Sequence, residues 1–401
     1  MINNFQNNLI NNNHNLNNNN QNNNLNLLSI YINNCSSKMH RTGLINIGQI
    51  CYMNSTIQCL SNIKSLTKDL LKKYQSNQFN SIEHPLALAY SNLLFILKTS
   101  KDKYIDPTLF KSTIGELNPL FKGMHPADAK DLFFFIIEKL HQELNKPIAL
   151  SGNNQKIDFR QQEIDSQDEI KTLKNFLKDF KLNNQSILSN IFYGYMRSKM
   201  KCNGCGITKY SFQTFNLLIF QLKKVKEFKR KLIGGNNYYN LNLIDSFECE
   251  KQEEILDGDN MIYCNNCKGL RPGIHQQSIY LLPNVIIIIL NRGRNNQDFN
   301  EEFVFPKILD LTDQNIIIQK DSFHKFYLCG IITHLGESGA GGHFIAYCRN
   351  NPESNFLCYN DAQVSEVSIE VAMSSKISNN EYEKKTPYIL LYHFMKDKET
   401  K

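Results

Sequence analysis

The sequence predicts an α+β fold, in which a helical part comes first and a part rich in strands follows. Up to about residue 144, apolar residues recur at helical spacing. After about residue 187 the texture changes to short apolar runs that are typical of strands. Helices first and strands later favour α+β over a repeating βαβ sheet, and no internal repeat is evident.

Three regions of the first part are predicted to be helical. Apolar residues at helical spacing predict helices between residues 54 and 74, and leucine-rich residues predict another over 85–98. A third is expected from about 127 to 144. The segment 150–186 is polar and poorly periodic, so we expect a loop or an insertion there.

Strands are predicted in the second part, where apolar runs are short. The segments are 211–221, 277–281, 285–290, 326–333, 343–348 and 388–394. The longest apolar runs of the chain have six residues, far short of the roughly 20 needed to span a bilayer.

The cysteine count argues against one class of protein. The 401 residues include eleven cysteines, an odd number that cannot pair completely, and the first Lys or Arg is Lys38, so no secretory segment is expected. We therefore do not expect a secreted disulfide scaffold. Free thiols, metal ligands or a nucleophile are the interpretations that remain.

The net charge of +7 falls short of the signature of a nucleic-acid-binding protein. The one dense basic run is 223–231, which we interpret as a solvated surface loop, with electrostatic contact to an acidic partner as the alternative.

The N-terminal tract is dominated by one residue type. Residues 1–34 contain eighteen asparagines, too few apolar residues to form a core, so we expect a disordered tail over 1–40. An interaction or prion-like role is the alternative.

Two C-x-x-C pairs predict a metal site, and their members are Cys202, Cys205, Cys264 and Cys267. Two such pairs complete a tetrahedral site of four thiolates for one structural zinc ion. Gly206 and Gly269, which follow the pairs, suit the required turns. The 58 residues between the pairs exceed a short zinc ribbon, so we expect the pairs to meet through an inserted pair of strands. Unrelated thiols or a thioredoxin-like redox pair are the alternatives.

The segment 43–60 predicts a reactive cysteine, because a loop with two glycines places Cys51 at the start of a predicted helix. The partial positive charge of a helix N-terminus favours thiolate over thiol. Asn46, five residues earlier, is a candidate donor to a developing oxyanion. The alternative is a buried, inert Cys51, which is what we expect of Cys59.

A cysteine nucleophile needs a base, and His343 is the candidate. Two glycines precede it and allow close approach of backbone or substrate. A later strand ends in Asn360 and Asp361, and a hairpin joining the strands would set one of them beside the imidazole. Alone, His343 would be interpreted as structural, but with Cys51 and Asn360 it makes a Cys-His-Asn set.

These residues, in this order, resemble the ubiquitin-specific proteases, a family of cysteine deubiquitinases. The resemblance covers about residues 41–396. The segments that carry it are 43–60, the two cysteine pairs, 279–290, 303–311, 327–361 and 388–394.

The resemblance implies a papain-like cysteine protease fold with a thumb, a palm and zinc-bearing fingers. The catalytic domain would cover 41–396. Its thumb would be about 41–186, its fingers would lie within about 187–280, and its palm would be mainly about 281–396.

The resemblance also implies a role for each candidate residue. Cys51 would be the nucleophile, His343 the general base, Asn360 its orienter and Asn46 an oxyanion donor, with Asp361 assisting. The reaction would be hydrolysis of the isopeptide or peptide bond after the C-terminal glycine of ubiquitin, through a thioester intermediate.

Substrate contacts are expected at Asp128, which resembles the acid that meets the basic ubiquitin tail, and at Gly342 and Phe344. The implied partners are ubiquitin and ubiquitinated proteins, with no nucleic acid and no membrane. We expect a monomer in the cytoplasm, the nucleus or both.

Three departures from the family pattern bear on substrate affinity. The family's usual Gln, Glu and Phe near Asp128 are replaced by Pro126, Asp131 and Leu132. Asn291 interrupts the usual Leu-Lys-Arg-Phe, and the tryptophan often found before the Asn-Asp pair is absent.

Two other functions compete with the enzyme. A catalytically weak ubiquitin-binding scaffold of the same fold is one, and the intact Cys-His-Asn set argues against it. A zinc-containing nucleic-acid binder is the other, motivated by the cysteine pairs and the basic run 223–231.

Overall fold

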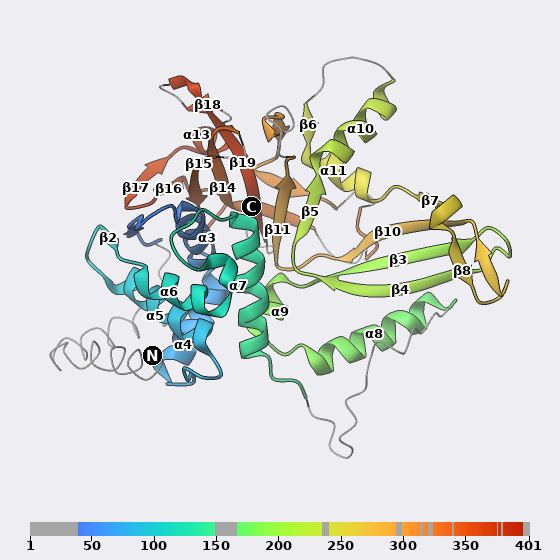
Figure 1. The fold of residues 1–401 in the computed structure, drawn as a ribbon, viewed down its shortest axis with the longest axis horizontal. Coiled ribbons are helices and arrows are strands. Elements are labelled where there is room, and N and C mark those ends of the chain that lie inside the picture. The colour runs from blue at the N-terminus through green and yellow to red at the C-terminus, as the bar shows by residue number, and fades with distance from the viewer. Residues whose placement is uncertain are drawn as a thin grey trace. The chain divides into compact units, whose positions relative to one another are not determined.

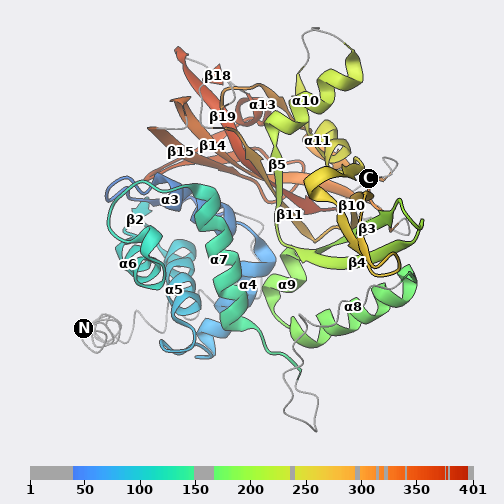
Figure 2. The same ribbon diagram turned by 45° about the vertical axis from the view of Figure 1, so that its right-hand side comes forward.

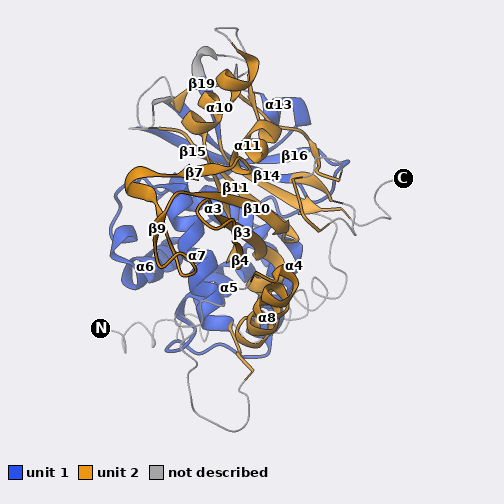
Figure 3. Ribbon diagram, turned by 90° about the vertical axis from the view of Figure 1, so that its right-hand side faces the viewer, with its two compact units in different colours: residues 1–144, 329–336, 341–387 blue, residues 145–328, 337–340, 388–401 orange. Residues whose placement is uncertain are grey.

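The computed structural model describes residues 39–148, 167–234, 240–293, 299–312, 316–319, 324–338, 341–374, 376–377 and 380–395. The predicted disordered tail falls outside the described residues except for residues 39 and 40, and so does most of the first half of the predicted loop 150–186. The described chain forms two compact units, drawn in two colours in Figure 3. Unit 1 contains the chain up to residue 144, with 329–336 and 341–387, and unit 2 contains the remainder.

In its described residues up to 144, unit 1 contains the helices α3 (Cys51–Ser61), α4 (Lys64–Gln75), α5 (Pro85–Thr99), α6 (Thr108–Leu117) and α7 (Ala129–Leu144). Helix α3 is buried on every side from Tyr52 to Ser61 and contacts α4, α7 and strand β15 (Gly341–Cys348). Helices α4, α5 and α7 lie together in Figures 1 and 2, and α5 contacts both of the others. The sequence did not predict α6, since Phe110 and Ile114 are its only large buried apolar residues.

The sheet of unit 1 carries the second half of the candidate site. Its strands lie in the order β17 (Gln363–Val367), β16 (Phe356–Asn360), β15 and β14 (Lys325–Ser338). Asn360 pairs with Gln363, so Asp361 and Ala362 form a two-residue hairpin turn. Asp361 has φ +50°, the left-handed conformation that such turns require and that Asp tolerates.

Smaller elements complete unit 1. Strand β1 (Gly43–Leu44) pairs in parallel with β2 (Tyr104–Ile105), and β18 (Lys376–Ile377) pairs with the start of β19 (Asn380–Phe394). A 3-10 turn, η1 (Pro119–Phe121), follows α6, and a short helix, α13 (Ile369–Met373), follows β17. Strands β14 and β19 each run through both units.

Unit 2 contains an antiparallel sheet of four strands in the order β4 (Thr208–Phe215), β3 (Gly194–Cys202), β10 (Gly273–Leu281) and β7 (Glu254–Leu256). Helix α8 (Glu169–Asn183) packs along β4, as Figure 2 shows, and α9 (Ile187–Phe192) precedes β3. The predicted loop over 150–186 is therefore wrong for its second half. Asp168 caps α8 by accepting the N–H of Lys171, and Phe176 packs edge-on against Tyr195 with ring centroids 5.3 Å apart.

A second set of strands in unit 2 is built on β11 (Val285–Asn291), in which Val285–Leu290 are all buried. It pairs with β5 (Leu218–Gln221) in parallel and with the end of β19 in antiparallel fashion. The remaining strands are β6 (Leu241–Asn242), β8 (Ile262–Cys264), β9 (Gly269–Arg271), β12 (Phe303–Val304) and β13 (Ile308–Asp310), with the turn η2 (Gly258–Asn260).

The basic run 223–231 lies in helix α10 (Leu222–Ile233), so the predicted surface loop is wrong; helix α11 (Leu243–Glu250) contacts it. The run is amphipathic, because Leu222 and Val225 are buried one turn apart. Three of its lysines form ion pairs, Lys229 with Asp245 at 2.6 Å, Lys224 with Glu250 at 3.6 Å, and Lys226 with Glu301. Among the described residues, no helix is both long and apolar enough to cross a membrane.

Candidate functional site

Helix α3 begins at Cys51, the residue that the sequence singled out as a nucleophile. The loop before it is shaped by Asn46, whose Oδ1 accepts the backbone N–H groups of Gly48 at 3.3 Å and Ile50 at 3.2 Å. Gly48 has φ +136°, a conformation that favours glycine. This loop leaves Cys51 half-buried at the N-terminus of α3.

His343 lies on β15 between two hydrogen-bond partners. Its Nε2 donates to Oδ1 of Asn360 across 2.7 Å, and its side chain is 32 % exposed. A hydrogen bond with Cys51 raises the pKa of His343 to about 9, and the bond to Asn360 adds to this against the effect of burial. The structure therefore brings Cys51, His343 and Asn360 together in one unit, although 292 residues separate the first two in sequence.

Asp361 stands next to this set but makes different contacts. Its Oδ2 lies 3.7 Å from Nε2 of His343, farther than Asn360, and accepts an N–H from the Asn46 amide at 2.9 Å. Asn46 is therefore tied at both ends, its Oδ1 by backbone N–H groups and its Nδ2 by Asp361. One Nδ2 hydrogen remains to donate to a substrate.

The predicted substrate residues Gly342 and Phe344 gather around His334, a buried residue of β14. The rings of Phe344 and His334 meet nearly at right angles, with centroids 4.9 Å apart. A Cβ on Gly342 would lie 2.3 Å from Cε1 of His334. His334 was not predicted, although a histidine within an apolar strand is the signal that could have identified it.

Asp128 precedes α7 and is half-buried. Lys130 contacts it twice, through its backbone N–H at 3.0 Å and its Nζ at 2.6 Å. Burial lowers the pKa of His334 to about 4, the charge of Asp128 opposes this change, and His343 adds to it. Asp128 and His343 therefore both act electrostatically on His334.

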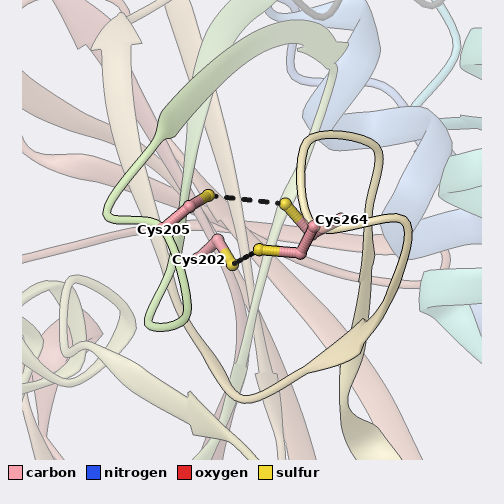
Figure 4. Close-up of side chains that lie close together, drawn as sticks. Cys202, Cys205 and Cys264 are labelled. Carbon is pink, nitrogen blue, oxygen red and sulfur yellow. Dashed lines mark hydrogen bonds between the residues drawn. The ribbon is translucent and has the colours of Figure 1, made fainter.

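Unit 2 holds the four predicted metal ligands, Cys202, Cys205, Cys264 and Cys267, whose sulfur atoms all lie within 4.8 Å of one another. Figure 4 shows Cys202 and Cys205 facing Cys264 across the cluster. The Cys205 and Cys264 sulfurs are 3.6 Å apart, and those of Cys202 and Cys267 are 4.0 Å apart. Tetrahedral zinc with bonds of about 2.3 Å requires sulfurs about 3.8 Å apart, so the donor set fits one such ion.

Backbone N–H groups favour the charged form of two of these cysteines, which is the form that binds metal, whereas burial and the neighbouring thiols raise the pKa of Cys267 to about 12. The N–H of Ile207 lowers the pKa of Cys205 to about 6, and the N–H of Cys267 lowers that of Cys264. Positive φ values occur at Gly206 (+71°) and Lys268 (+50°), so the second turn uses Lys268 rather than the predicted Gly269.

The predicted route between the two cysteine pairs is wrong. We expected an inserted pair of strands, but the chain between Cys205 and Cys264 contains β4, β5, α10, β6, α11 and β7 before it reaches β8. Of the described elements between β4 and β8, only β7 belongs to the sheet that contains β3 and β4, and it pairs there with β10.

Comparisons with known proteins show which proteins this chain is similar to. The sequence profile of the family described as ubiquitin carboxyl-terminal hydrolase matches residues 42–392. Ubiquitin carboxyl-terminal hydrolase 2 of Bos taurus is 26 % identical over 342 residues, which are 84 % of this chain and 54 % of that protein. Ubiquitin carboxyl-terminal hydrolase 4 of Saccharomyces cerevisiae (strain YJM789) is 27 % identical over 383 residues, or 88 % of this chain and 39 % of that protein. The chain therefore spans about half the length of these relatives or less.

Proposed function

The chain belongs to the ubiquitin carboxyl-terminal hydrolase family, and we propose on this basis that it is a cysteine-type deubiquitinase. Its reaction is hydrolysis of the isopeptide or peptide bond that follows the C-terminal glycine of ubiquitin. One observation carries the proposal: the imidazole of His343 lies between the Cys51 thiol and the Asn360 amide, with a 2.7 Å hydrogen bond to the latter. A nucleophile, a base and an orienting group are the minimum for this chemistry.

The reaction follows from the role of each group. Sγ of Cys51, as a thiolate paired with the His343 imidazolium, attacks the scissile carbonyl carbon, and the C=O electron pair moves to the oxygen. The remaining N–H of Asn46 and the Cys51 backbone N–H donate to this oxyanion. Collapse re-forms the carbonyl and breaks the C–N bond, and His343 gives its proton to the leaving amine. His343 then takes a proton from water, whose oxygen attacks the thioester and releases Cys51.

Asn360 keeps the imidazole in the orientation that this sequence of steps needs. Because Nε2 donates to Asn360, the other ring nitrogen, Nδ1, is the one left to exchange a proton with the thiol. This arrangement favours an active enzyme over the catalytically weak scaffold, which has no need of an oriented base.

We propose that the two units build the papain-like thumb, palm and fingers that the resemblance implies. Within unit 2 the four cysteines would hold a zinc ion, which ties strands β3 and β8 together and takes no part in catalysis. Asp128 would receive a basic residue of the ubiquitin tail, in exchange for Lys130. Placement in the cytoplasm, the nucleus or both belongs to the same proposal.

Hydrolysis of diubiquitin and of a fluorogenic ubiquitin C-terminal amide tests the function. The chain should release product from both, and the Cys51→Ala and His343→Ala variants should lose at least about 10³-fold in kcat/KM. Equal turnover by wild type and Cys51→Ala would refute the proposal. The zinc content, measured by atomic absorption, should be one ion per chain.

A further inference from the structure

The hairpin turn between β16 and β17 is fastened to the loop that precedes Cys51. The backbone oxygen of Asp361 accepts the N–H of Leu44 at 2.9 Å. The backbone oxygen of Ala362 lies 2.4 Å from the place where a Cβ on Gly43 would be, so only glycine allows this approach. The turn that follows Asn360 thus rests directly against the start of the nucleophile loop.

The carboxylate of Asp361 adds two side-chain bonds to this junction. Oδ2 accepts from Asn46 at 2.9 Å, and Oδ1 accepts from Nδ2 of Asn54 at 2.8 Å. Asn54 lies on α3, three residues after Cys51, and is 2 % exposed. Its Nδ2 also faces the carbonyl oxygens of Leu44 and Ile45, both at the longer distance of 3.3 Å.

We propose that Asn54 is a positioning residue for the oxyanion donor Asn46, and that it acts through the Asp361 carboxylate. A carboxylate is planar, so a donor that fixes Oδ1 also fixes where Oδ2 lies. Fixing Oδ2 sets the direction of the Asn46 amide, whose other end is already held by Gly48 and Ile50. The inference rests on the proposed function, since Asn46 has an oxyanion to meet only if acyl chemistry takes place.

The same bond keeps two acceptors near His343 in separate roles. Oδ2 of Asp361 is 3.7 Å from Nε2, whereas Oδ1 of Asn360 is 2.7 Å from it. Hydrogen bonds to an ionised carboxylate are about twice as strong as neutral ones, so an unrestrained Asp361 would compete for the imidazolium. With both carboxylate oxygens engaged by asparagine amides, Asn360 remains the partner of His343.

Asn62 provides a matched control, because its amide ties the C-terminal end of α3 to β16 without reaching the site. Its Nδ2 donates to the Gln58 carbonyl at 2.8 Å and to the Tyr359 hydroxyl at 3.3 Å. Loss of this amide should affect stability in the same way as loss of Asn54. It should leave the Asn46 amide where it is.

The test is a double-variant cycle in the full chain, with the fluorogenic ubiquitin amide as substrate. Asn46→Ala should lower kcat about 100-fold, the usual effect of one lost oxyanion donor. Asn54→Ala should lower kcat about tenfold, with KM within about twofold of wild type. Because Asn54 acts through Asn46, the double variant should be within about threefold of Asn46→Ala alone. Asn62→Ala should keep kcat within about twofold of wild type.

Alkylation of Cys51 by chloroacetamide, followed by mass spectrometry of the Cys51 peptide, separates the explanations. Alkylation involves no oxyanion, so Asn54→Ala should leave its rate within about twofold while hydrolysis falls. If Asn54→Ala does not fold, Asn54→Leu, which has the same number of side-chain heavy atoms but neither an amide donor nor a charge, takes its place in every arm. If the kcat losses of Asn46→Ala and Asn54→Ala multiply in the double variant, the inference is wrong. It is also wrong if Asn54→Ala slows alkylation as much as hydrolysis. Neither result would contradict the proposed function. A wild type that is alkylated at Cys51 yet hydrolyses no ubiquitin substrate overturns the proposed function and, with it, the inference.

Discussion

Substitution of Gly342 by alanine tests whether the residue before His343 must lack a side chain. Gly342 has φ +150°, which L side chains rarely adopt. A Cβ there would lie 2.3 Å from Cε1 of His334 and 2.4 Å from the backbone oxygen of Leu335. His334 is only 4 % exposed, so its ring has little space into which to move.

The size of the effect follows from these two problems. An unfavourable backbone conformation costs of order 1–3 kcal/mol. Overpacking against a buried ring and a fixed carbonyl costs typically 1–3 kcal/mol more. We therefore expect Gly342→Ala to lower the free energy of unfolding by about 2–5 kcal/mol, and to displace the adjacent His343 enough to lower kcat at least about tenfold.

Gly341 is the matched control, because a Cβ there meets nothing within 4 Å. Urea unfolding and ubiquitin-amide hydrolysis would be measured for both variants at one pH. Gly341→Ala should match wild type within about 0.5 kcal/mol, as surface substitutions usually do. If Gly342→Ala were as stable and as active as Gly341→Ala, the close packing of β14 against Gly342 would be wrong.

Three further perturbations have defined outcomes. Cys264→Ser, or chelation of wild type, should remove the bound zinc and lower the unfolding midpoint; an unchanged midpoint would mean that the four cysteines hold no structural ion. The pKa of His343 is raised to about 9, so its proton is held below that value and lost above it, and the basic limb of kcat/KM should lie near pH 9. Asn360→Ala should move that limb down by about one pH unit, and a stationary limb would show that Asn360 does not orient the base. Lys111→Met should destabilise the chain by about 2 kcal/mol in urea unfolding, because the Phe121 carbonyl and the Tyr52 hydroxyl lose a buried donor, whereas an unchanged midpoint would show that this buried amine contributes nothing.

Features that depend on local pattern were predictable from the sequence. The run 285–290 is apolar at every position, and it forms a strand that is buried throughout. The glycine-punctuated loop before Cys51 does end where α3 begins. The cluster of four cysteines was predictable, because C-x-x-C spacing lets both thiolates of a pair reach one metal ion.

Helices α8 and α10 are among those that the sequence did not predict, and both have narrow apolar faces. In α10 six basic residues conceal an amphipathic pattern in which Leu222 and Val225 are the buried members. In helix α8 only Thr172 is buried, and the helix packs through Phe176, which contacts Tyr195 of β3. Packing against a partner, rather than local propensity, stabilises both helices.

Contacts between distant side chains could not be predicted from local pattern. Asn46 and Asp361 are 315 residues apart, and Asn54 and Asp361 are 307 apart. The sequence suggested that either Asn360 or Asp361 would orient His343. The register of the β16–β17 hairpin decides between the two residues. It directs Asn360 to the imidazole and Asp361 to the nucleophile loop.

The central claim is that Cys51 is the nucleophile of a ubiquitin hydrolase, and a ubiquitin probe with a C-terminal electrophile tests it most directly. Wild type should gain the mass of one ubiquitin, with the new bond mapped by peptide mass spectrometry to Cys51. Cys51→Ala should gain nothing, although ten other cysteines remain. A wild type that forms no adduct, or an adduct that persists in Cys51→Ala, would contradict the account.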